Sequence, residues 1–395
     1  MKKLAIIGRG TVGCTSVAHF LHFTDCEIDW YYDPSINPTP VGEATNLAIM
    51  QTWRESLGMF ADSHFELQST SKIGIMKRDW GSLGKTFLHP FRLGQTAIHF
   101  SGHTFQQVVF DKIKDNKRVT LHEGNFEPED IDSDYVMVCT GSPNELNDDF
   151  IVSDCIPVNA CLVSQCEWDH ARFDYSLTYA MPNGWAFGIP LRNRCSIGYV
   201  HNSDFADRET INEEIEPLLD ELDLVPSSQN YLNFNNYYRK QNFTDRIVYN
   251  GNASFFLEPL EATSTNFADN INRNCFDLWF SNQLTVDQCN EGYLKELRNT
   301  ELMMSLHYAS GSSFDTEFWS FAKDKGLARL KQGIENDELF IHNLFYNIAQ
   351  EVDETMPMAG SWDAALNYRL HIDKLGMRNT LFDLVAGPKL VSGGQ

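Results

Sequence analysis

The stretch that decides the fold is KLAIIGRGTVG, residues 3–13. Its apolar, β-branched opening predicts a short buried strand, and small and apolar residues recur at helical spacing in TSVAHFLHF, residues 15–23. Between them lies the pattern G-x-G-x-x-G, made by Gly8, Gly10 and Gly13. Glycines at these positions allow a tight turn, close approach of a phosphate and close packing of helix on strand. We therefore predict a strand, turn and helix with a phosphate-binding helix N-terminus.

A second predicted strand extends this unit. EIDWYYD, residues 27–33, ends in Asp33, twenty residues after Gly13, and an acid at that spacing binds ribose hydroxyls in dinucleotide-binding folds. The pattern alone fits both NAD and FAD. Because the chain carries a single glycine fingerprint, FAD in this site would leave no obvious second site for NADPH, and electrons would arrive from elsewhere. The predicted cofactor contacts here are Gly8, Gly10, Thr11, Val12, Gly13 and Asp33.

The rest of the chain predicts a mixed sheet followed by helices. DYVMVCTGSP, residues 134–143, is typical of a buried parallel strand that ends in a small-residue turn. Residues 183–203 alternate apolar and polar side chains around a predicted turn at 191–193, which favours an antiparallel hairpin. After about residue 275, the segments 293–308 and 334–352 carry apolar residues at three- and four-residue spacing. We expect an α/β protein with a helical C-terminal region.

Composition excludes several classes of protein. Of 395 residues, 54 are acidic and 31 basic, and a net charge of -23 repels both nucleic acid and anionic membranes. No apolar run approaches the roughly 18 residues of a membrane span, and the apolar part of MKKLAIIG is too short for a signal peptide. Nine cysteines without a CxxC or Cys/His metal spacing favour reduced thiols and no metal. We expect a cytoplasmic enzyme without nucleic-acid or membrane partners, and the sequence is compatible with a homo-oligomer.

Several separated segments carry a family resemblance. PTPVGEAT (38–45), NGWAFGIP (183–190), FLEPLEATS (256–264) and LHY with FDTEFW (306–308 and 314–319) occur in the order seen in flavin-dependent halogenases. From residue 1 to about residue 330 the chain resembles the tryptophan-halogenase family. The resemblance implies an FAD-binding, Rossmann-like (GR2-type) flavoprotein monooxygenase fold with a mixed β-sheet and a C-terminal helical substrate layer. It divides the chain into an FAD-binding domain with an inserted substrate-side sheet, 1–275, and a closely packed helical substrate-binding region, 276–395.

The resemblance also implies cofactors and partners. FAD would act as FADH2 supplied by a separate flavin reductase, and O2 and a halide ion would be consumed with it. The substrate would be a small, free, electron-rich aromatic such as an indole or phenol. The GEAT element adds Glu43, Ala44 and Thr45 to the expected cofactor-binding residues.

Lys72 corresponds to the lysine that the family needs for halogenation, at the start of the apolar strand SKIGIMKRDW. Taken alone, this lysine would be interpreted as the solvated end of a strand. In a halogenase, reduced flavin and oxygen oxidise halide to hypohalous acid, and a buried amine restrains that product. An ammonium would donate a hydrogen bond to it, whereas a neutral amine would form a haloamine, and both readings stay open. Lys77, Arg78 and Lys85 are predicted to be solvated.

The remaining predicted site residues follow from the same resemblance. Glu261 is expected to face Lys72 across the substrate ring and to stabilise the cationic intermediate or accept its proton, and Glu258 is expected to be structural. His307 and Trp319 are expected to hold the helical layer together. The backbone N–H groups of Thr263 and Ser264 are the expected halide site. The expected substrate pocket is His89, Pro90 and Phe91, and the expected tunnel signature is Trp185, Phe187, Ile189 and Pro190.

Two departures from the family affect the prediction. Phe187 replaces the second tryptophan of the family's W-x-W-x-I-P signature, and the chain is shorter than well-known members, apparently in the substrate-capping region. A more open pocket would restrain a large halogen less, so we predict that bromide and iodide are preferred to chloride. The alternatives are a flavin-dependent aromatic monooxygenase (hydroxylase), an NAD-linked dehydrogenase and a flavoprotein fold that serves only as a binding surface.

Overall fold

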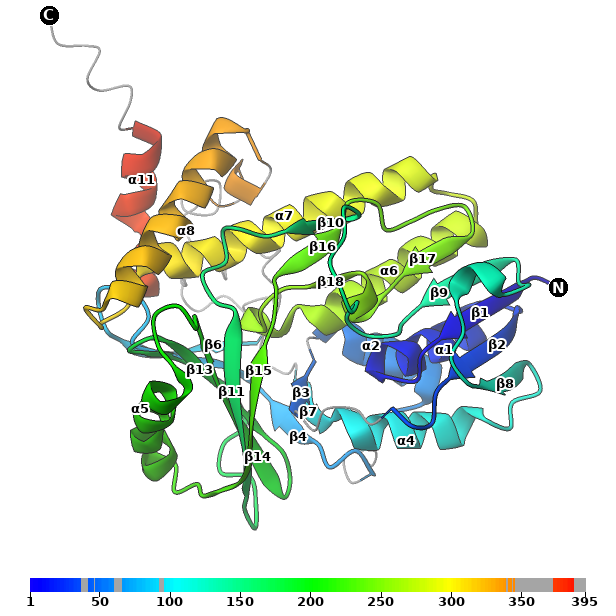
Figure 1. Ribbon diagram of the computed structural model, residues 1–395, viewed down its shortest axis with the longest axis horizontal. Coiled ribbons are helices and arrows are strands. Elements are labelled where there is room, and N and C mark those ends of the chain that lie inside the picture. The colour runs from blue at the N-terminus through cyan, green and yellow to red at the C-terminus, as the bar shows by residue number, and fades with distance from the viewer. Residues whose placement is uncertain are drawn as a thin grey trace, which may run out of the picture.

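The computed structural model describes most of the chain, and Figure 1 shows how its elements are arranged. The described residues are 1–36, 42–45, 47–59, 66–91, 96–338, 340–342, 344 and 372–386. The helices in these ranges are α1 (Thr11–Phe23), α2 (Leu47–Leu57), α4 (Gly102–Ile113), α5 (Arg208–Glu221), α6 (Ser264–Trp279), α7 (Val286–Ser310), α8 (Glu317–Glu335) and α11 (Arg378–Ala386). The short 3-10 helices are η1 (Pro128–Asp130), η2 (Gly251–Ala253) and η3 (Leu260–Ala262).

A parallel sheet forms one half of the fold, at the right of Figure 1. Its strand order is β17-β9-β1-β2-β8, and all neighbouring strands run parallel. The strands are β1 (Lys3–Ile7), β2 (Glu27–Tyr32), β8 (Val119–Glu123), β9 (Tyr135–Val138) and β17 (Ile247–Tyr249). Helix α1 follows β1 directly and packs against α2, α4 and α6. The predicted strand, turn and helix, and the parallel strand within 134–143, are confirmed.

The turn between β1 and α1 shows why glycine is needed there. Gly8 has φ +117°, and a Cβ atom on it would lie 2.2 Å from the carbonyl oxygen of Cys139 on the neighbouring strand's end. A Cβ on Gly13 would lie 2.2 Å from the carbonyl oxygen of Gly8, so the helix can pack on the strand only without that side chain. The indole of Trp30 donates a hydrogen bond to the same Gly8 carbonyl, at 2.9 Å. Close backbone packing and the hydrogen bond from Trp30 on β2 therefore hold the turn in place.

We expect Gly8→Ala to lower the free energy of unfolding by at least about 2 kcal/mol, from backbone strain of about 1–3 kcal/mol and steric overlap. Gly10→Ala is the matched control, because Gly10 has φ -67° and its Cβ would meet nothing within 4 Å. That variant should stay within about 0.5 kcal/mol of wild type. Urea unfolding of the three proteins measures the difference. Equal stability of the two variants would contradict this account of the turn.

A large mixed sheet forms the other half, at the lower left of Figure 1. Its strand order is β15-β11-β14-β13-β12-β5-β6, in which β12 and β5 run parallel and every other pair runs antiparallel. The predicted hairpin of residues 183–203 is confirmed as β13 and β14. The strands are β5 (Gly74–Arg78), β6 (Thr86–Pro90), β11 (Ala160–Glu167), β12 (Ser176–Met181), β13 (Gly184–Pro190), β14 (Arg194–His201) and β15 (Pro226–Asn233).

Two small sheets connect the halves. One has the order β10-β16-β18 and the other β3-β7-β4. In the second, the central strand β7 pairs Phe100 with Glu43 of the GEAT element on one side and Ala97 with Lys72 on the other. These pairings bring the expected cofactor-side segment and the expected reactive lysine into one small sheet. The strands are β3 (Gly42–Ala44), β4 (Thr70–Lys72), β7 (Ala97–Ser101), β10 (Phe150–Val152), β16 (Tyr237–Arg239) and β18 (Phe255–Phe256).

The C-terminal part is helical, as predicted. The segment 293–308 lies in α7, whose N-terminus carries a capping box of Thr285 and Gln288, and α8 packs along it. Much of the segment 334–352 lies outside the described residues. One apolar cluster joins side chains of β1 and α7, so the helices share the core of the parallel sheet. All nine cysteines are buried and free, and no helix among the described residues has the length and apolarity of a membrane span.

Candidate active site

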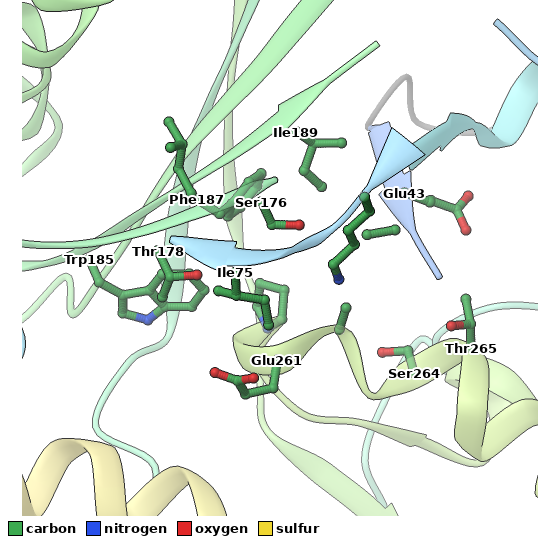
Figure 2. A pocket seen from close by; sticks show the side chains of 15 residues that line it. Glu43, Ile75, Ser176, Thr178, Trp185, Phe187, Ile189, Glu261, Ser264 and Thr265 are labelled. Atoms are coloured by element: carbon green, nitrogen blue, oxygen red, sulfur yellow. The ribbon is translucent and has the colours of Figure 1, made fainter. Parts of the chain in front are cut away.

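A cavity of about 220 Å³ lies where the two halves of the fold meet. Figure 2 shows Glu261, Ser264 and Thr265 on one stretch of chain, facing the strands that carry Ile75 and Ser176. The cavity thus joins four regions that are far apart in the sequence, one of which is the hairpin of β12 and β13. It is lined by Glu43, Ala44, Lys72, Ile75, Ser176, Leu177, Thr178, Trp185, Phe187, Ile189, Pro259, Glu261, Ala262, Ser264 and Thr265.

Lys72 is a buried amine and not a solvated strand end. Its residue is 2% exposed, and Nζ donates a long hydrogen bond of 3.4 Å to the carbonyl oxygen of Thr45. Nζ also lies 5.6 Å from the centre of the Phe91 ring. Burial lowers the pKa of Lys72 to about 8, because the attraction of Glu261 only partly offsets desolvation and Lys77 repels the charge. The amine therefore exchanges between its charged and neutral forms near neutral pH.

Glu261 stands on an unusual turn beside this amine. Glu261 and Ala262 both adopt left-handed backbone conformations, with φ of 69° and 53°. The carboxylate lies 2.5 Å from Lys77 Nζ and 3.5 Å from His307 Nε2. Burial alone would raise the pKa of Glu261, but the Lys77 ammonium and the His307 ring hold it well below the usual value. Glu261 is a fixed negative charge, and its direct partner is Lys77.

The prediction that Lys77 is solvated is wrong. The side chain is fully buried on β5, with Nζ 5.7 Å from the ring centre of Trp80. Desolvation lowers its pKa, and the bond to Glu261 opposes that shift. His307, expected only to hold the helical layer, also contacts Glu261, while its Nδ1 lies 2.8 Å from the Met303 carbonyl oxygen. Both residues therefore belong to the site.

The turn before α6 has the features of an anion site. Ser264 starts the helix, and among the described residues the Thr263 side chain makes no capping hydrogen bond, so backbone N–H groups there stay available. Both Ser264 and Thr265 line the cavity. The Thr265 hydroxyl is buried and has no hydrogen-bond partner among the described residues. This end of the cavity can bind a small anion.

The signature strand β13 forms another wall. Trp185, Phe187 and Ile189 line the cavity, whereas the Pro190 carbonyl accepts a 2.6 Å hydrogen bond from the Thr70 hydroxyl. The Phe187 ring lies over Gly198, where an added Cβ would come within 2.1 Å of it. The phenylalanine therefore fills the space beside the cavity and is locked against the neighbouring strand.

Glu258 is structural, as predicted. It is fully buried and accepts hydrogen bonds from Trp185 Nε1 at 3.0 Å and from the Tyr308 hydroxyl at 2.6 Å. Burial raises its pKa to about 7. Trp319, from the FDTEFW element, donates a 2.7 Å hydrogen bond to the Met181 carbonyl and packs in the helical layer, as expected. This network holds the signature strand against α7.

The expected substrate residues lie close by, but outside the lining of this cavity. His89 and Pro90 end β6, Phe91 follows, and none of the three is among the described residues that line it. Desolvation and the neighbouring cations lower the pKa of His89 to about 4, although Glu261 opposes the shift. The imidazole is therefore neutral at physiological pH, in the neighbourhood of Glu261.

The β1–α1 turn fits a dinucleotide. An added Cβ on Gly10 would meet nothing within 4 Å, so the first turn of α1 is open to a phosphate. Thr11 donates a 2.8 Å hydrogen bond to the Glu43 carboxyl, whose pKa burial raises to about 7. Asp33 lies at the end of β2, as expected, and accepts hydrogen bonds from the backbone N–H and hydroxyl of Ser35. Ala44 lines the cavity beside Glu43, and the Thr45 carbonyl accepts the hydrogen bond from Lys72.

A hydrogen-bonded chain at this site was not predicted. Because the Thr70 hydroxyl donates to the Pro190 carbonyl, it accepts from Nδ1 of His99 at 3.2 Å. This leaves Nε2 of His99 to accept from the Ser176 hydroxyl at 2.9 Å, on the cavity wall. The sequence feature that could have indicated this chain is the histidine at position 99, within the mostly apolar segment AIHFS, residues 97–101.

Comparisons with known sequences all find similarity to tryptophan halogenases. The sequence model of the family described as tryptophan halogenase matches residues 3–145 and 106–337. A tryptophan 6-halogenase of Streptomyces toxytricini is 24% identical over 296 residues, which cover 68% of this chain and 55% of that protein. A tryptophan 7-halogenase of a Kutzneria strain is 26% identical over 154 residues, 38% of this chain and 28% of that protein. The alignments thus span roughly half or less of these relatives' lengths.

Solved structures share the fold over almost the whole chain. A flavin-dependent halogenase from a Brevundimonas species superposes with a TM-score of 0.73 and 21% identity, covering 98% of this chain and 97% of that one. A flavin-dependent halogenase from Xanthomonas campestris gives a TM-score of 0.74 and 17% identity, covering 98% and 96%. The predicted Rossmann-like α/β fold is confirmed.

Proposed function

Because the chain belongs to the tryptophan halogenase family, we propose that it is a flavin-dependent halogenase of free, electron-rich aromatics. It uses FADH2, O2 and halide to make hypohalous acid, whose halogen Lys72 delivers to an indole- or phenol-like substrate. The observation that carries this proposal is the enclosure of Lys72, Glu261 and the N-terminus of α6 around one cavity. An oxidised halogen formed there would meet a buried amine before it met solvent.

FAD would be held by Gly8, Gly10, Thr11, Val12, Gly13 and Asp33, with Glu43, Ala44 and Thr45 on the side of the cavity. When bound and reduced, it supplies the two electrons that O2 needs to oxidise a halide. The single glycine fingerprint supports a separate flavin reductase as the electron donor. The open first turn of α1 supports binding of the pyrophosphate.

Residues of this chain would bind the halide, take up the oxidised halogen and stabilise the cationic ring. Backbone N–H groups at Thr263 and Ser264 bind the halide ion, and Phe187 and Trp185 line another part of the same cavity. Lys72 takes up hypohalous acid at its amine. Glu261, which stays ionised, stabilises the cationic ring that forms when the aromatic carbon bonds the halogen. Water is largely excluded from the Lys72 amine and the Glu261 carboxylate, because both side chains are buried.

The test is a mass-spectrometric assay of purified protein with FAD, a flavin reductase, NADH, air, mixed halides and a panel of indoles, phenols and anilines. Catalase and a free thiol are added in parallel reactions, because leaked hypohalous acid would mimic an enzymatic product. Halogenated product that survives both additions is the expected result. If the reaction is run under 18O2 without halide, an aromatic product that contains oxygen-18 would indicate a monooxygenase instead. Tight NADH binding without flavin affinity would indicate a dehydrogenase.

Bromide and iodide should be used in preference to chloride. The heavier halides are more easily oxidised, and a more open pocket would restrain a larger halogen less. Equimolar competition of the three halides with one substrate, with products quantified by mass spectrometry, measures the preference. Equal or greater incorporation of chlorine would contradict it.

A further inference from the structure

Two of the described lysines are buried, and both lie at the active site. Lys72 is 2% exposed and Lys77 is fully buried, and they stand only five residues apart. A buried ammonium is costly unless a carboxylate compensates it. Glu261 is the carboxylate whose charge acts on both lysines, and Glu258 adds a weaker attraction to Lys77 only. Two amines therefore share one strong counter-ion.

The backbone explains how both side chains reach the same carboxylate. Strand β4 ends at Lys72 in one sheet, and β5 begins at Gly74 in another, so the chain changes sheets at Ile73. The Ile73 backbone bonds to Asp174 and Phe91. Without this break, strand alternation would direct residues 72 and 77 to opposite faces.

The two lysines are not equivalent toward Glu261. Lys77 Nζ contacts the carboxylate at 2.5 Å, whereas the hydrogen bond that Lys72 makes goes to the Thr45 carbonyl. Lys72 also faces the cavity, and Lys77 does not line it. Lys77 is therefore the direct ion-pair partner of Glu261. The ammonium form of Lys72 is stabilised less by the same carboxylate.

The other charged or titratable groups around Lys72 do not replace that partner. His99, on β7, is buried and its pKa lies well below the usual value, so it is neutral. Glu43 lines the same cavity but accepts a hydrogen bond from Thr11, and burial raises its pKa to about 7. Lys77 itself repels a charge on Lys72.

We propose that Lys77 is a positioning residue: it holds Glu261 as a permanent counter-ion and thereby increases the fraction of the Lys72 amine that is neutral. This inference deepens the proposed function and rests on it for the halogen step. A neutral Lys72 attacks the halogen of hypohalous acid with its lone pair. The N–X bond forms as the O–X bond breaks, and the leaving hydroxide takes a proton from nitrogen, giving a haloamine and water. A charged Lys72 lacks that lone pair and can only donate a hydrogen bond.

The experiment is an NMR titration of protein labelled with [ε-13C]lysine, without flavin, halide or substrate. The resonance absent from Lys72→Met assigns Lys72. We expect its midpoint near pH 8 in wild type, and higher by about one unit or more in Lys77→Met, because removing the second cation leaves Glu261 to stabilise the Lys72 ammonium. Lys77→Arg is the matched control, since it keeps a cation against Glu261 and should hold the wild-type midpoint.

An unchanged Lys72 midpoint in a folded Lys77→Met protein would overturn the inference. Lys77→Gln, which keeps an N–H donor for the carboxylate, serves as the second neutral variant if methionine prevents folding. Should neither fold, Glu261→Gln decides: it must lower the midpoints of both lysines, and lowering only that of Lys72 would overturn the assigned pairing. Since no turnover is needed, failure here is distinct from failure to halogenate.

Discussion

Replacing Lys72 by methionine is expected to abolish halogenation while FAD binding is retained. Methionine keeps an unbranched side chain in the buried position but removes the amine that meets the oxidised halogen. Loss of a group that acts in a water-excluded site typically costs at least about 10²-fold in rate. The halogenated product of wild type and Lys72→Met is compared by mass spectrometry, and FAD affinity is followed by flavin fluorescence.

Lys85→Met is the matched control for this prediction, because Lys85 is a nearby exposed lysine. It should halogenate like wild type. If Lys72→Met binds FAD and still halogenates in the presence of catalase and thiol, the amine has no role in delivery. The chain would then share the fold of its family but not the delivery of the halogen by this lysine.

Glu258→Ala is expected to lower the free energy of unfolding by about 2–4 kcal/mol. The variant leaves the buried donors Trp185 Nε1 and the Tyr308 hydroxyl without their shared acceptor, and it opens a cavity between β13 and α7. The two donors can bond to each other, at 3.1 Å, which limits the loss. Urea unfolding at neutral pH measures it.

Glu258→Gln is the control, since its amide oxygen can still accept both hydrogen bonds. Folding raises the pKa of Glu258 from about 4.5 to about 7, so the protonated carboxyl favours the folded state. That contribution is complete below pH 4.5 and is lost as the pH rises through 7. The stability of Glu258→Gln relative to wild type should therefore increase between pH 5 and pH 8. A constant difference would contradict the raised pKa of the buried Glu258 carboxyl.

Local patterns in the sequence were enough for much of the fold. The spacing of Gly8, Gly10 and Gly13 predicted the turn, because the constraint there is a steric one between neighbouring elements. The alternation in residues 183–203 predicted the hairpin, and the periodicity of 293–308 predicted α7, since each side chain's burial follows from its own helix or strand. Family motifs then identified Lys72 and Glu261 as members of one site.

The sequence by itself determined the dinucleotide-type turn, the α/β class and the candidate lysine, while the tertiary structure alone decided which lysine pairs with Glu261. Strand alternation would place Lys72 and Lys77 on opposite faces, and Lys77 was expected in solvent. The change of sheets at Ile73 removes that alternation, and the left-handed turn at Glu261 directs a carboxylate to Lys77. Both events depend on partners far away in the chain, because a buried charge is stable only where folding brings its counter-ion.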